Sequence, residues 1–129
     1  MRIAKIASIY SIFVGIAMLG LWIMLLSTNQ VPELISEPYR ITAHILAEIA
    51  TAAFLFISGF GLFRKKTWGM KVFLFAQGAL FYTLIASSGY YVQLGVLPIV
   101  AMFIILMVLT MIFLGQAILK QDEFEVNNK

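Results

Sequence analysis

The sequence contains no cysteine, a single histidine (His44) and few charged residues. Without cysteine, the chain cannot carry out disulfide exchange or bind a metal ion or an iron–sulfur cluster through thiolates. One histidine cannot supply, within a monomer, the imidazoles of a multi-histidine metal site or of a bis-histidine haem site. We therefore predict no metal site and no cofactor for the monomer.

Charge is scarce because hydrophobic residues replace it. Charged residues make up 12% of the 129 residues and hydrophobic residues 62%. Typical soluble domains have about 25% charged and about 45–50% apolar residues. The mean hydropathy is +0.98. A chain this short has too much surface relative to its volume to hide so many apolar side chains from water. This composition excludes a soluble globular domain and a disordered protein, and it indicates that lipid surrounds most of the chain.

Four apolar segments are long enough to cross a bilayer as helices, which takes roughly 20 residues. These segments span about residues 6–26, 41–63, 70–92 and 98–119. A polar tail, residues 120–129, follows the fourth segment. The first apolar run is longer than that of a signal peptide, so we expect it to be retained. The sequence thus predicts one domain, residues 1–129, with an all-α fold.

Short connections between the four segments predict an integral membrane bundle of four helices with up-down-up-down topology. Small residues mark the expected close contacts between helices. These are Gly15, Gly20, Gly59, Gly61, Gly78 and Gly89. Ala43, Ala47 and Ala50 share one face of the second segment, and that face could support a homo-oligomer.

Basic residues predict the orientation of the bundle. When the sides alternate, Arg40 is the only one of the nine Lys and Arg residues on its side of the membrane. The other basic residues include the cluster Arg64–Lys66 and accompany both termini. The positive-inside rule therefore places the N and C termini in the cytoplasm. The same rule, together with anionic lipid headgroups, explains the basic cluster without nucleic-acid binding.

Ionisable groups occur well inside a span at only two positions, His44 and Glu48. Residues four apart are neighbours on a helix surface, and Arg40 and Thr51 continue the same face. Charged groups at this depth usually face the bundle interior or a wet cavity. We expect His44 and Glu48 to titrate as one unit. The alternative is a structural role as interhelical hydrogen bonds, worth roughly 0.6–2 kcal/mol per contact.

Polar residues in the outer half of the third segment could face this pair. Helical spacing divides them into one face with Ser88 and Tyr91 and another with Tyr82. We favour Ser88 and Tyr91 and keep Tyr82 as an alternative. The outer half of the fourth segment is apolar and offers a wall. The sequence therefore predicts an outward-opening polar pocket between the second and third segments, with Trp22 near its mouth.

Such a pocket suits a binding protein for a small molecule, a quinone or a lipid, or an accessory subunit. One alternative is an isomerase-type enzyme inside the membrane. His44 or Glu48 would then be the acid–base group, and Tyr82 or Tyr91 a proton donor. Another is a proton-coupled transporter that works as an oligomer. A homodimer could also place two His44 side chains around a haem or a metal ion.

The stretches His44-Ile-Leu-Ala-Glu48 and Gly89-Tyr90-Tyr91, within this topology, resemble small, mostly uncharacterised four-helix prokaryotic membrane proteins that are DoxX-like in layout. The likeness covers most of the chain as topology and only these stretches as motif. It implies a multi-pass protein of the prokaryotic cytoplasmic membrane. It implies no established activity and assigns no catalytic residue.

Overall fold

The computed structural model describes residues 2–124, and within these residues every element of regular secondary structure is a helix. The helices are α1 (Arg2–Ser27), α2 (Glu33–Ser36), α3 (Pro38–Phe63), α4 (Gly69–Leu94), α5 (Leu97–Leu119) and α6 (Gln121–Phe124). The four long helices contain the four predicted spans, which confirms the all-α fold. Each is long and apolar enough to cross a membrane. Residues 125–129 of the predicted tail lie outside the described part.

Two short helices were not expected from the sequence. Helix α2 lies in the connection between α1 and α3, and α6 follows α5 directly. The predicted tail is polar in composition, yet its Phe124 is buried in the core and its ring lies 5.7 Å from that of Phe73. A single aromatic residue thus attaches the beginning of the tail to α4.

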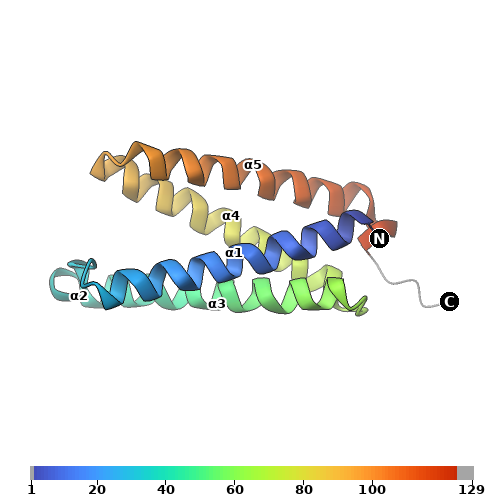
Figure 1. Ribbon diagram of the computed structural model, residues 1–129, viewed down its shortest axis with the longest axis horizontal. Coiled ribbons are helices and arrows are strands. Elements are labelled where there is room, and N and C mark those ends of the chain that lie inside the picture. The colour runs from blue at the N-terminus through green and yellow to red at the C-terminus, as the bar shows by residue number, and fades with distance from the viewer. Residues whose placement is uncertain (1, 125–129) are drawn as a thin grey trace.

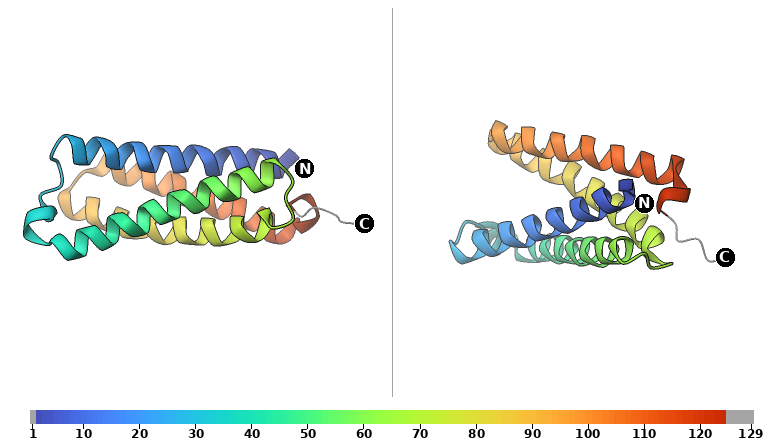
Figure 2. Two further views of the ribbon diagram at one scale, coloured as in Figure 1. Left: turned by 90° about the horizontal axis from the view of Figure 1, so that it is seen from below. Right: turned by 45° about the vertical axis from the view of Figure 1, so that its right-hand side comes forward.

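The long helices alternate in direction along the bundle (Figure 1). Helix α1 packs against α3, α3 against α4, and α4 against α5. The up-down-up-down topology predicted from the short connections is therefore present. Helices α1 and α5 lie close together near the described chain ends and diverge toward the opposite end (Figures 1 and 2). We call that opposite end, where α1 connects to α3 and α4 to α5, the distal end.

Buried hydroxyl groups tie the middle of the bundle together. Tyr10 on α1 reaches α5, where its hydroxyl donates to the carbonyl oxygen of Leu106 at 3.1 Å and lies 2.8 Å from the Thr110 hydroxyl. Ser11 on α1 and Ser58 on α3 also share a hydrogen bond of 2.9 Å. These bonds satisfy the hydroxyls internally, as lipid would require.

Glycine permits the closest contact between α1 and α3. A Cβ atom on Gly59 would lie 2.5 Å from Cγ1 of Ile12 and 2.9 Å from the carbonyl oxygen of Ser8. Gly15 and Gly61 also lie against neighbouring residues, as predicted. Positions 20, 78 and 89 are open, with no atom within 4 Å of an added Cβ, so the prediction for those three glycines is wrong. The face of α3 with alanines 43, 47 and 50 is exposed.

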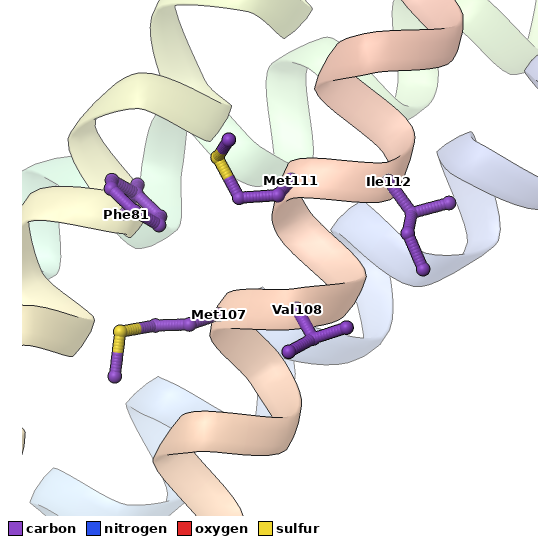
Figure 3. A pocket seen from close by; sticks show the side chains of 5 residues that line it. All are labelled: Phe81, Met107, Val108, Met111 and Ile112. Carbon is purple, nitrogen blue, oxygen red and sulfur yellow. The ribbon is translucent and has the colours of Figure 1, made fainter.

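The outer surface of the bundle is apolar. Large hydrophobic side chains are exposed along all four long helices. This apolar surface includes a shallow hollow of about 400 Å³ between α4 and α5 (Figure 3). Phe81 of α4 and Met107, Val108, Met111 and Ile112 of α5 line it. No polar side chain lines this hollow, so it has the character of a surface for acyl chains.

The Gly59 contact gives a test of this packing. We expect Gly59→Ala to lower the free energy of unfolding by about 1–3 kcal/mol, because the new methyl group meets the backbone of α1. The control is Gly78→Ala, where the added methyl group enters open space. Thermal unfolding of the purified protein in mild detergent measures both. Equal stability of the two variants would contradict the close approach of α1 and α3.

Candidate functional site

A cavity of about 650 Å³ opens in the distal half of the bundle. Residues of all four long helices and of the segment 30–33 line it. Its volume lies within the range of about 300–1,000 Å³ that is typical of small-molecule sites. The sequence predicted a pocket between α3 and α4, with Trp22 of α1 near its mouth and α5 as an apolar wall. In the structure α1 and α5 supply much of the lining, because these two helices diverge toward the distal end.

The carboxylate of Glu48 is the most enclosed charged group of the cavity. Glu48 lies on α3 and is 8% exposed. Oε2 accepts a hydrogen bond from the indole N–H of Trp22 on α1. Oε1 accepts one from the hydroxyl of Ser87 on α4 at 3.2 Å. Donors from two other helices thus converge on this carboxylate.

His44 lies one helical turn from Glu48 on α3. Its Nε2 atom is 3.4 Å from Oε1 of Glu48, as the spacing of four residues predicts. The imidazole is partly exposed to the cavity, and its ring centre lies 6.0 Å from that of Trp22. Trp22 therefore touches both members of the pair.

Tyrosines close the polar part of the cavity toward the distal end. Tyr90 donates a hydrogen bond of 2.5 Å to Oε1 of Glu33 on α2, which links α4 to the connection between α1 and α3. Tyr91 packs edge-on against Tyr90, with ring centres 5.1 Å apart, and against Phe103 of α5 at 5.7 Å. Both tyrosines line the cavity.

The remainder of the cavity is apolar. Phe13, Val14 and Met18 of α1 line it on one side, and Leu80 and Leu106 face them from α4 and α5. From Trp22 to Phe13 the wall runs nine residues along α1, or about 14 Å at 1.5 Å per residue. The cavity is therefore amphipathic, with a polar region near the distal end and a long apolar region that reaches the middle of the bundle.

Four of the eight residues predicted for the site line this cavity, and four lie elsewhere. His44, Glu48, Trp22 and Tyr91 line it. Thr51 and Ser88 donate their hydroxyls to backbone carbonyl oxygens of their own helices, Thr51 to that of Ala47 at 2.8 Å and Ser88 to that of Leu84 at 2.7 Å.

The other two predicted residues point away from the bundle. Tyr82 is 74% exposed on the outer surface of α4. Arg40 is exposed and pairs with Glu37, whose Oε1 lies 3.3 Å from its Nη1. Neither side chain lines the cavity in the described structure. Arg40 can extend toward water, as long basic side chains at an interface do.

Four polar lining residues were missed by the sequence analysis: Gln30, Glu33, Ser87 and Tyr90. The signal for Ser87 was present, because Leu80, Leu84, Ser87 and Tyr91 follow the helical spacing of three and four residues. Glu33 lies in a connection, where periodicity gives no orientation. Its contact with Tyr90 depends on how the bundle folds.

The arrangement suits binding of an amphipathic molecule, whose polar head would lie beside Glu48 and whose apolar part would extend toward Phe13. Within residues 2–124, no group of three or more His, Cys, Asp or Glu side chains is placed to hold a metal ion.

Comparisons with known proteins give a family and no relative of known activity. Neither the curated proteins nor the solved structures contain a match to this chain. One family model, described as a domain of unknown function (DUF8058), matches residues 1–129. Because that match covers the whole chain, the chain belongs to the DUF8058 family.

Proposed function

We propose that this chain is a multi-pass protein of the prokaryotic cytoplasmic membrane that binds an amphipathic small molecule, such as a quinone or a lipid, in the distal cavity. The observation that carries this proposal is the cavity itself, which joins a polar region around Glu48 to a long apolar region. Ligand sites in proteins commonly combine a few converging polar groups with apolar walls in this way.

The surface supports a membrane location. All four long helices have the length and composition of spans, and their exposed side chains are largely hydrophobic. Apart from Arg40, the described Lys and Arg residues lie at the end of the bundle opposite the cavity. Basic residues mark the cytoplasmic side. In this orientation both termini are cytoplasmic and the cavity lies in the outer half of the membrane.

Energetics support an interior role for the His44–Glu48 pair. A charged group facing acyl chains near the middle of a bilayer costs several kcal/mol, and the short side chain of Glu48 does not reach water easily. The pair instead faces the cavity, where Trp22 and Ser87 supply hydrogen bonds to the carboxylate. An arrangement that holds a carboxylate beside empty volume suits a ligand headgroup better than helix packing alone.

Ligand entry fits the same picture. Phe13 on α1 and Met102 on α5 both line the cavity and are exposed, so the cavity opens between these two helices. In a membrane this opening faces acyl chains. An amphipathic molecule would therefore reach the site sideways from the outer leaflet.

The orientation predicts the result of cysteine labelling, for which the chain offers a background free of native thiols. We expect a membrane-impermeant maleimide to label Ile35→Cys in intact cells, because this exposed residue of α2 lies at the outer end. Lys66→Cys, in the basic connection, should react only after the cells are opened. Labelling of Lys66→Cys in intact cells would contradict the orientation.

Binding predicts that a variant which fills the cavity loses its ligand. We expect Ala17→Phe, which adds a ring to the cavity wall, to reduce the amount of co-purified amphipathic molecule about tenfold or more. Ala101→Phe is the matched control, because Ala101 is exposed on α5 and does not line the cavity. Mass spectrometry of lipid extracts from protein purified in mild detergent measures both. Equal amounts bound to the two variants would contradict the proposal.

A further inference from the structure

Several hydrogen-bond donors around the cavity already have partners. The indole N–H of Trp22 and the hydroxyl of Ser87 donate to Glu48, and the hydroxyl of Tyr90 donates to Glu33. Nε2 of His44 also faces Glu48. Because a carboxylate has about four lone-pair sites, acceptor capacity remains after these contacts are made. A ligand headgroup therefore meets free carboxylate acceptors, in addition to the hydroxyl of Tyr91 and the amide of Gln30, which also line the cavity.

Apart from the imidazole of His44, which pairs with Glu48, the charged residues that line the cavity are acidic. Glu33 and Glu48 are its acidic residues, and among the described residues that line the cavity there is no Lys or Arg. The nearby Arg40 pairs with Glu37 outside the cavity. A phosphate or carboxylate headgroup would thus enter beside two carboxylates without a Lys or Arg partner, and like charges at short distance repel. The lining disfavours anionic amphiphiles.

Aromatic rings surround the same polar region. Trp22, Tyr90, Tyr91 and Phe103 line it, and the rings of the last three pack in succession. Faces of aromatic rings attract cations, and the attraction grows when water is removed. Carboxylates and aromatic faces together form the usual surroundings of an ammonium group.

From the acceptors, the acidic lining and the aromatic rings we infer that the cavity takes an amphipathic organic cation, with an alkylammonium head beside Glu48 and an apolar tail along Phe13, Met18 and Leu80. This inference rests on the proposed binding function and narrows its ligand class. The ammonium N–H groups donate to the carboxylate of Glu48, and the tail fills the apolar region toward Leu106.

Three probes with the same tail and different heads test the headgroup. Dodecylamine is cationic at neutral pH, dodecanol is uncharged and dodecanoate is anionic. The protein is placed in nanodiscs of zwitterionic phosphatidylcholine, and native mass spectrometry follows occupancy as the mole fraction of each probe rises. We expect dodecylamine to bind about tenfold or more tightly than dodecanol, as one charge-assisted hydrogen bond would give, and dodecanoate to bind most weakly.

A matched pair of carboxylate variants tests the position of the head. Glu48→Gln keeps the shape of the side chain and removes its charge, so dodecylamine should lose about tenfold in affinity. Dodecanol should bind the variant within about twofold of the original, which also shows that the cavity still forms. Glu37→Gln is the control, because Glu37 is exposed and pairs with Arg40 outside the cavity. It should leave the binding of both probes unchanged.

The outcomes separate the two proposals. If dodecanol or dodecanoate binds as tightly as dodecylamine, or if Glu48→Gln leaves dodecylamine binding intact, the cation inference is wrong and the binding function stands. If none of the probes binds and Ala17→Phe retains as much co-purified amphiphile as Ala101→Phe, both proposals are wrong.

Discussion

The carboxylate of Glu48 holds together three of the four long helices at the level of the cavity. It accepts hydrogen bonds from Trp22 on α1 and Ser87 on α4, and His44 supports it from its own helix. Removing one partner of a buried charge typically costs about 3–5 kcal/mol, because the remaining charge loses its compensation. The contact therefore fixes how α1 and α4 sit relative to α3. The shape of the polar region depends on it.

Hydropathy and the cost of buried charge were enough to predict the main elements. Apolar length predicted all four long helices, and the spacing of His44 and Glu48 predicted their contact. Ser87 was missed in favour of Ser88, because adjacent residues differ by about 100° around a helix and packing decides which one faces inward. Tyr82 and Arg40 were misplaced because polarity at a given depth does not reveal the direction of a side chain. A tyrosine or arginine near an interface can point outward at little cost.

The position and shape of the cavity could not be predicted from the sequence and became visible only in the folded structure. Its space arises from the divergence of α1 and α5 toward the distal end. Tyr10 connects these two helices through its hydrogen bond to Leu106, which lies 96 positions away in the sequence. The periodicity of the sequence within one helix contains no information about such long-range contacts. The role of α2 could not be predicted for the same reason, since its Glu33 is linked to the site by a hydrogen bond from the distant Tyr90. The orientation in the membrane and the resemblance to DoxX-like proteins stay predictions.

Under the proposed function, ligand entry from the membrane between α1 and α5 would change what affinity means for this protein. A molecule that enters from the leaflet is already dissolved in lipid, so the site samples its mole fraction among lipids and not its concentration in water. An apolar tail leaves acyl chains for an apolar wall and gains little from that exchange. The transfer of the tail then contributes little discrimination between ligands. Selectivity must come from the few polar contacts around Glu48, where the headgroup exchanges its interfacial water for the protein.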